Sequence, residues 1–142
     1  MVSPKEFESR EEWAQALLAQ IQTFDADLVV LAGFMRILPG AFVNALTPHL
    51  INMHPALLPL YPGAHAVRDA LAAGATVTGA TVHVVDEGVD TGPIIRQVEV
   101  AIEPADTEET LHERIKVVER DLIVATVTAI AQSQVNLEEI AR

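Results

Sequence analysis

The sequence predicts an α/β protein built on a twisted, mainly parallel sheet with an antiparallel pair of strands at its edge. Short apolar runs alternate with segments of helical spacing, and the connections between them are short. The last two strand-like segments flank a turn that contains glycine, which indicates the antiparallel pair. With 142 residues, 50% of them apolar, the chain is expected to form one domain over residues 1–142.

The first helix is expected to begin after Ser9, because Ser9 and Glu12 have the spacing of a capping box. Its end is expected near Asp25. Its inner face would carry the apolar residues that follow at helical spacing, which are Trp13, Leu17, Ile21 and Phe24.

The middle of the chain alternates between expected strands, helices and one ordered loop. Leu28–Ala32 is a continuous apolar run, which is typical of a strand buried on both faces of a parallel sheet. Ala41–Leu46 indicates a short helix, and His49–Met53 indicates a second buried strand. Three prolines and a glycine make Pro55–Gly63 an ordered, extended loop, and Val67–Ala73 indicates a short helix that ends at a glycine.

The last third is expected to form a hairpin and a long helix. Val77–Val85 and Ile94–Ile102 both alternate in the manner of strands, and they flank the Asp86–Pro93 turn. Asp106 or Thr107 is expected to cap the helix that follows. Its inner stripe would be Leu111, Ile115, Val118, Leu122, Ile123 and Val127.

Composition and charge limit the classes of function. The net charge of −11 opposes nucleic acid and anionic lipid as main partners. No apolar run reaches the ~18 residues that cross a bilayer, and the N-terminus has no signal-peptide pattern. The absence of cysteine fits a cytoplasmic protein. An anionic small substrate would require the few cations to gather at its site.

Two loops next to apolar strands carry the residues best suited to chemistry. Asn52 and His54 stand at the start of Asn52–Pro59, and Asp90 stands within Asp86–Pro93. An amide, an imidazole and a carboxylate can together polarise a carbonyl, move a proton and orient the group that moves it. Each residue also has a purely structural interpretation: Asn52 as a turn former, His54 as a loop-packing histidine and Asp90 as the start of an Asx turn.

Four segments in combination resemble one family. They are Ala32–Leu38, Asn52–Gly63, Gly79–His83 and Asp86–Pro93, and they resemble the phosphoribosylglycinamide formyltransferases, folate-dependent transformylases of purine biosynthesis. The resemblance covers most of residues 9 to 120. It implies a Rossmann-like formyltransferase fold and transfer of a formyl group from 10-formyltetrahydrofolate to the amine of glycinamide ribonucleotide. The chain would then be the C-terminal, folate-binding and catalytic portion of one formyltransferase domain.

The resemblance also implies roles for individual residues. The catalytic residues would be Asn52, His54 and Asp90. The folate pocket would be formed by Met35, Arg36, Ile37, Leu38, Val85, Asp86 and Asp90, and Phe42, Val43 and Leu50 belong either to that pocket or to the core. The ribonucleotide would contact Lys116, Glu119 and Pro55. His83 would support Asp90, and Arg10 would hold an anionic ligand such as the folate glutamate tail.

Structural alternatives remain for four of these side chains. Lys116 and Glu119 could form a solvated ion pair on one helical face, His83 could be a satisfied core histidine, and Arg10 could be an ordinary surface arginine. His54, His83 and Asp90 could also imitate a metal triad. The resembled family uses no metal, so none is expected.

The sequence departs from the family pattern at its start. Family members begin with a strand and a Gly-rich loop that grips the ribosyl phosphate through backbone N–H groups, and no such loop is found here. About two βα units, at ~30 residues for each βαβ crossover, would be missing. A late gene start, a truncation or a partner chain would each explain this. The chain alone is therefore expected to bind folate better than the ribonucleotide.

Three other functions compete with this interpretation. A formyltetrahydrofolate hydrolase would use the same three side chains with water, but usually has a second histidine where this chain has Pro55. An aminoacyl-tRNA formyltransferase is disfavoured by the net charge of −11. A non-catalytic fragment could bind folate or a partner through an open sheet edge. The expected partners are small molecules, not nucleic acid or membrane, and a homodimer is left open.

Overall fold

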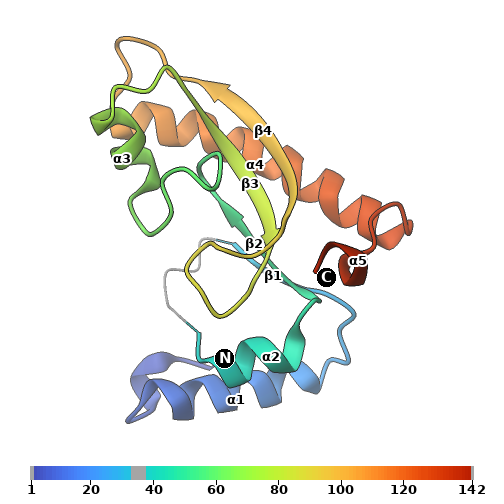
Figure 1. Ribbon diagram of the computed structural model, residues 1–142. Coiled ribbons are helices and arrows are strands. Elements are labelled where there is room, and N and C mark those ends of the chain that lie inside the picture. The colour runs from blue at the N-terminus through green and yellow to red at the C-terminus, as the bar shows by residue number, and fades with distance from the viewer. Residues whose placement is uncertain (1, 33–37, 142) are drawn as a thin grey trace.

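The computed structural model describes residues 2–32 and 38–141, and Figure 1 shows helices packed around a small twisted sheet. The predicted α/β class is confirmed. In chain order the elements are η1 (Pro4–Glu6), α1 (Arg10–Gln22), β1 (Val29–Leu31), α2 (Gly40–Leu46), β2 (Leu50–His54), α3 (Ala66–Ala72), β3 (Val77–Val84), β4 (Ile94–Ala101), α4 (Glu108–Ala131) and α5 (Leu137–Ile140).

The four strands form one mixed sheet in the order β1-β2-β3-β4. β1 and β2 run parallel, whereas β2–β3 and β3–β4 are antiparallel. The predicted β3–β4 hairpin is confirmed, but the parallel share of the described sheet is smaller than expected. The reason is that the connection between β2 and β3, residues 55–76, returns the chain to the end of the sheet at which β2 finished.

Two predictions about the N-terminal half are wrong. Val30 in β1 is 37% exposed, so β1 is not buried on both faces. β1 lies at the outer position of the sheet and pairs with β2 alone among the described strands. Phe24 is 72% exposed because α1 ends at Gln22 and Phe24 lies beyond its last turn. The N-cap prediction is confirmed, since the Ser9 side chain accepts from the Glu12 backbone N–H at 3.1 Å.

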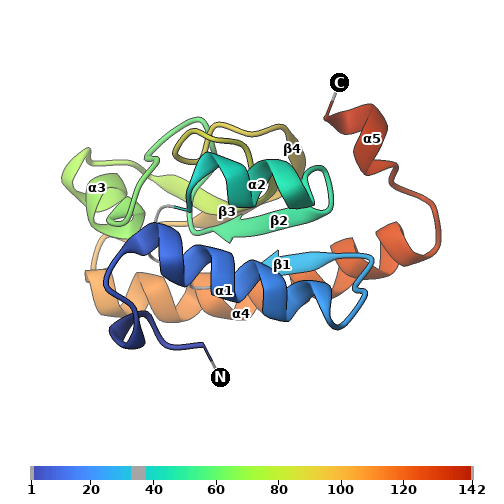
Figure 2. The ribbon, with the colours of Figure 1, turned by 90° about the horizontal axis from the view of Figure 1, so that it is seen from below.

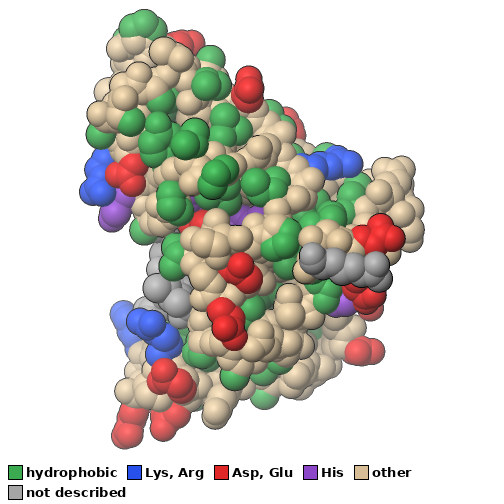
Figure 3. Space-filling view, viewed as in Figure 1, with side chains coloured by type: hydrophobic (Ala, Val, Ile, Leu, Met, Phe, Trp, Pro, Cys, Tyr) green, Lys and Arg blue, Asp and Glu red, His purple; other side chains and the backbone are tan. Residues whose placement is uncertain are grey.

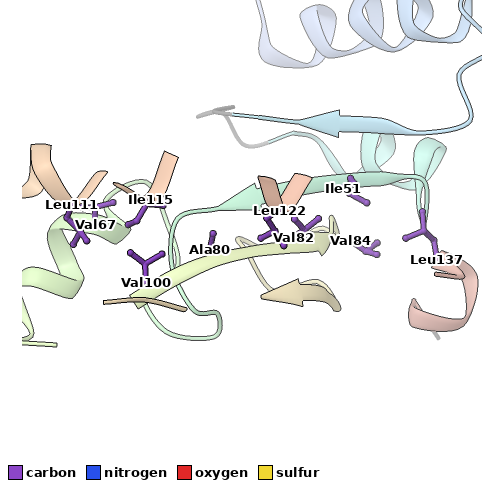
Figure 4. Close-up of a cluster of buried hydrophobic side chains, with 10 residues drawn as sticks. All are labelled: Ile51, Val67, Ala80, Val82, Val84, Val100, Leu111, Ile115, Leu122 and Leu137. Carbon is purple, nitrogen blue, oxygen red and sulfur yellow. The ribbon is translucent and has the colours of Figure 1, made fainter. Parts of the chain in front are cut away.

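Adjacent residues of β2 separate the core into two clusters. Leu50 packs with Trp13 of α1 and Phe42 of α2, whereas Ile51 packs with Leu111 and Leu122 of α4. Successive strand residues point to opposite faces, so the sheet is covered on both sides. Figure 2 shows α2 and α4 on opposite sides of the strands, and Figure 4 shows the α4 cluster, in which side chains from the strands meet those of α3, α4 and α5.

The long helix α4 is stabilised by an N-terminal cap and by buried side chains. Thr107 caps it, with Thr110 in the reciprocal bond of a capping box. Fully buried Leu111 and Ile115 each contribute about 1.5–3 kcal/mol of hydrophobic stabilisation. No helix in the described part of the chain is long and apolar enough to cross a membrane.

The outer face of the β3–β4 hairpin is partly apolar. Val77 and Ile94 are each more than 40% exposed, and Figure 3 shows hydrophobic side chains gathered over the upper part of the molecule. The opposite face of the hairpin packs on α4, and the loop that follows β2 covers the outer face at Thr81, which is fully buried.

Candidate active site

A cavity of about 830 Å³ lies between β2, the 85–90 loop and α4. Its volume falls in the range of about 300–1,000 Å³ that is usual for small-molecule sites. Asn52, His54, His83 and Asp90 line its polar part, and Leu31, Leu38, Val43 and Val85 line an apolar part. The cavity therefore offers a flat apolar wall beside a small group of donors and acceptors.

His54 and Asp90 meet at the centre of the polar part. His54 is the last residue of β2, and its Nδ1 lies 3.4 Å from Oδ2 of Asp90. On the other side of the ring, Nε2 lies 2.8 Å from the carbonyl oxygen of Tyr61. A carbonyl oxygen only accepts, so the proton is assigned to Nε2. Both ring nitrogens of His54 thus lie next to an acceptor oxygen.

His83 connects Asp90 to Asn52. Its Nε2 lies 3.5 Å from Oδ1 of Asp90 and 3.4 Å from Nδ2 of Asn52, and its Nδ1 lies 3.0 Å from the carbonyl oxygen of Val84. The side chain is buried within the sheet, where Asn52 and His83 are cross-strand neighbours. His83 thus combines the two interpretations given to it from sequence, a core histidine and a neighbour of Asp90.

Asp90 is held in an unusual backbone conformation. Its φ of 56° lies in the left-handed region, which aspartate tolerates better than most residues. The backbone N–H of Gly63 donates to its Oδ2 at 2.8 Å. Burial alone would raise the pKa of Asp90, but the hydrogen bond to His83, the Gly63 N–H and the neighbouring His54 outweigh it and lower that pKa. Asp90 is therefore ionised at neutral pH.

The loop that carries Asp90 is itself tied down at two places. Oδ1 of Asp86 accepts from the Gly88 N–H at 2.9 Å and from the Thr91 hydroxyl at 2.7 Å, which is an Asx-type turn. Glu87 accepts from the Asn44 amide of α2 at 2.8 Å. The turn interpretation given to Asp90 from sequence thus applies to Asp86, and Asp90 is left to face the cavity.

α4 presents charged side chains to the opposite wall of the cavity. Lys116 and Glu119 both line it, together with Pro55. The ion pair of Lys116 is with Glu113, at 3.1 Å, so the alternative of a solvated Lys116–Glu119 pair is not the arrangement found. Burial raises the pKa of Glu119, and the nearby positive charge of Lys116 offsets only part of that rise.

The expected folate residues fall into three groups. Leu38, Val43, Val85 and Asp86 line the cavity, whereas Phe42 and Leu50 are buried core residues. Met35, Arg36 and Ile37 lie outside the described residues. Ala32 and Leu38, which flank that segment, both line the cavity.

Arg10 is not brought to the cavity. It is the exposed first residue of α1 and is not among the described residues that line the cavity. Its position at a helix N-terminus follows from the capping serine before it. The position of Arg10 thus agrees with the alternative given from the sequence, an ordinary surface arginine.

Several groups at the cavity were not identified from the sequence. Tyr61 and Gly63 act through their backbone atoms, which no side-chain motif reveals. His65 and His112 also line the cavity. His112 lies four residues before Lys116, so helical spacing was the signal that could have found it. Arg120, one of the few cations that an anionic substrate would require at its site, lines the cavity as well.

The Asp90 carboxylate lies next to both His54 and His83, with one oxygen 3.4 Å and the other 3.5 Å from a ring nitrogen of each. Among the residues that the structure describes, no group of three His, Cys, Asp or Glu side chains is arranged to hold a metal ion. The arrangement suits instead a cluster in which two imidazoles share one carboxylate and an amide stands beside them.

Fold and site together define an α/β protein with an Asn–His–Asp cluster in a ligand-sized cavity. Residues 1–127 match the family model described as formyl transferase, and the chain belongs to this family.

Similar proteins carry one recurrent name. The chain is 56% identical to phosphoribosylglycinamide formyltransferase of Mycobacterium tuberculosis over 123 residues. The aligned region covers 87% of this chain and 57% of that protein. The enzyme of the same name from Bacillus subtilis is 45% identical over 112 residues, covering 79% and 57%. The crystal structure of glycinamide ribonucleotide transformylase 1 from Symbiobacterium toebii matches with a TM-score of 0.89 and 40% identity, covering 92% of this chain and 62% of that one. The chain thus spans little more than half the length of these curated relatives.

Proposed function

We propose that this chain is the folate-binding and catalytic portion, in one domain, of a phosphoribosylglycinamide formyltransferase. The reaction would move the formyl group of 10-formyltetrahydrofolate to the amine of glycinamide ribonucleotide. The observation that carries the proposal is the meeting of His54 and Asp90, with Nδ1 and Oδ2 3.4 Å apart, beside Asn52 in the cavity. The names of the relatives at 45% and 56% identity support the same reaction.

The cavity suits a folate as the formyl donor. The apolar wall that includes Leu38, Val43 and Val85 can cover the faces of a flat ring, and the backbone and side chain of Asp86 offer polar contacts at its edge. The polar part then receives the formyl group. Each half of the cavity thus matches one half of the donor.

Charge on the formyl oxygen develops as the amine attacks the formyl carbon. Asn52 can donate an amide N–H to that oxygen, and the Nε2–H of His54 can be shared between Tyr61 O and the same oxygen in a three-centre bond. Removing one such donor from comparable sites costs about 3–4 kcal/mol of barrier. Asp90 orients His54 through its Nδ1, and it can take a proton from the amine through a water.

α4 supplies the groups proposed for the ribonucleotide. Glu119 can accept from the amine, and Lys116 offers a point charge to the phosphate. Pro55, which follows His54 in the chain, lines the same cavity. A lysine alone cannot replace a ring of backbone donors, so the ribonucleotide should bind to this chain more weakly than the folate.

The test follows formyl transfer by the chain at saturating 10-formyltetrahydrofolate and with glycinamide ribonucleotide raised into the millimolar range. Light scattering first establishes that the protein is monodisperse, since the outer strands offer open edges. Both products are measured: formylated ribonucleotide and free formate. Formylated ribonucleotide as the main product supports the proposal. Formate release at one rate, whether ribonucleotide is present or not, would show a hydrolase. The absence of both products would reject catalysis by this chain.

A further inference from the structure

Two side chains outside the cavity lining fasten the loop that follows His54. The Thr81 hydroxyl donates to Ala56 O at 2.7 Å and accepts from the Leu58 N–H at 3.2 Å and from the Gln97 amide at 3.0 Å. Gln97 also donates to Leu58 O at 2.7 Å. Three backbone groups of Ala56 and Leu58 are therefore satisfied by Thr81 and Gln97 rather than by a strand.

The sheet register explains why these two residues meet the loop. His54 is opposite Thr81 in the β2–β3 pair, and Thr81 is opposite Gln97 in the β3–β4 pair. The three residues thus form one row across the sheet, with the end of β2 at one side. Thr81 is fully buried, so its hydroxyl must be paired within the protein.

The far end of the same loop reaches the site through its backbone. Tyr61 O lies 2.8 Å from Nε2 of His54, and the Gly63 N–H lies 2.8 Å from Oδ2 of Asp90. Tyr61 has a φ of 54°, so its carbonyl is turned by a conformation that a free chain rarely adopts. The contacts of Tyr61 and Gly63 depend on where the loop is anchored at Ala56 and Leu58.

We propose that Thr81 and Gln97 are positioning residues for formyl transfer. They hold the backbone of residues 55–63 so that Tyr61 O orients His54 and the Gly63 N–H stabilises the Asp90 carboxylate. This inference rests on the proposed function, because the groups that are positioned would take part in formyl transfer. The loop geometry itself can be measured without any turnover. Neither residue touches the reacting atoms, so each acts only through the loop.

The first experiment replaces Thr81 by valine in the full chain, with two matched variants. Thr78→Val is the control, because Thr78 lies on the same strand, is equally buried, and its hydroxyl has no hydrogen-bond partner among the described residues. Thr81→Ser keeps the hydroxyl. We expect Thr81→Val to lower kcat by about 10- to 100-fold, as a misplacement of about 1 Å can. The KM for the folate should change much less, Thr78→Val should leave kcat unchanged, and Thr81→Ser should restore most of it.

The second experiment follows the Asp90 carboxyl by carbon NMR as the pH is varied. Ring nitrogens of His54 from β2 and His83 from β3 lie within 3.5 Å of the Asp90 carboxylate. The other titratable or charged groups of the cavity are His65, Asp86 and Glu87 from loops and Glu108, His112, Lys116, Glu119 and Arg120 from α4. None of these is altered by Thr81→Val, so loss of the Gly63 N–H is the expected change, and the pKa of Asp90 should rise. Gln97→Met, at an exposed position of β4, should give a smaller rise and provides the same test if Thr81→Val does not fold.

The outcomes separate this inference from the proposed function. A higher Asp90 pKa in Thr81→Val or Gln97→Met, with no change in Thr78→Val, supports positioning even if the chain transfers no formyl group. An unchanged Asp90 titration in folded Gln97→Met and Thr81→Val overturns it, whatever the activity. Equal effects of Thr78→Val and Thr81→Val would also overturn it, because they would indicate general loss of stability.

Discussion

The backbone N–H of Gly63 donates a 2.8 Å hydrogen bond to Oδ2 of Asp90, and the two residues are 27 positions apart in the sequence. The same oxygen faces Nδ1 of His54. Two loops that follow different strands therefore meet at one carboxylate. This junction links the position of the two loops to the protonation of the site.

Gly92 at the end of the Asp90 loop should not tolerate a side chain. A Cβ there would collide with the carbonyl oxygen of Val84, which belongs to the rigid end of β3. We expect Gly92→Ala to lower the free energy of unfolding by about 1–3 kcal/mol, as overpacking does. Urea unfolding measures this. Gly40→Ala is the comparison, because its nearest neighbour would be the end of the Glu87 side chain, which can move away by giving up its bond to Asn44. Its loss should be smaller, and an equal loss in both variants would contradict the account.

Asp106 should make stability depend on acid pH. Hydrogen bonds from Arg114, at 2.7 and 2.9 Å, and from the Glu103 N–H hold the pKa of Asp106 well below its usual range. A lowered folded-state pKa stabilises the protein above the unfolded-state pKa of about 3.9, and this contribution is lost as the pH falls toward the folded-state value. Asp106→Asn should therefore be less stable than the unaltered chain at pH 7, and the difference should narrow as the pH drops below about 4.

Urea unfolding at pH 7 and at a pH below about 4 checks the Asp106 prediction. Asp69→Asn is the matched control, since the Asp69 carboxylate is exposed and lies 3.4 Å from an exposed Arg68. Its effect should be small at either pH. A difference for Asp106→Asn that stays constant from neutral to acid pH would rule out the proposed role of its charge.

Replacement of Glu119 should raise the stability of the protein but weaken its binding of the ribonucleotide. Because burial raises its pKa, the ionised carboxylate at neutral pH opposes folding. The sign follows from linkage: a raised folded-state pKa means that stability is lost as the pH rises from the unfolded-state to the folded-state value. Glu119→Gln should raise the melting temperature at pH 7 and weaken binding of the ribonucleotide. Calorimetry measures both quantities, and a lower melting temperature with unchanged binding would refute the assignment.

Much of the fold could be predicted because its signals are local. The Ser9 cap, the Thr107 cap and the β3–β4 hairpin each depend on residues close in sequence. The exposure of Val30 and the antiparallel pairing of β2 with β3 could not be predicted in this way. Both depend on which strands become neighbours, and apolar runs alone do not carry that information.

The residues of the site likewise fall into those that the sequence reveals and those whose contacts depend on the tertiary structure. Asn52, His54 and Asp90 stand out because their side chains and loop settings are chemically distinctive, and the structure brings them to one cavity. The backbone contacts of Tyr61 and Gly63 depend on loop conformation, which residue type does not determine. Thr81 and Gln97 meet only through the register of three strands, so neither could be linked to His54 before the pairing was known.

The central claim is that the ionised Asp90 beside His54 drives formyl transfer, and the pH dependence of kcat for the chain and its Asp90→Asn variant tests it most directly. The variant keeps the shape of the side chain and removes its charge. Asp69→Asn again serves as the control for an unrelated charge. We predict that Asp90→Asn lowers kcat by about 10²–10⁴-fold, the usual contribution of acid–base groups, and removes the acid limb of the profile. A variant that transfers formyl groups at a rate close to that of the unaltered chain, with the same acid limb, would contradict the account.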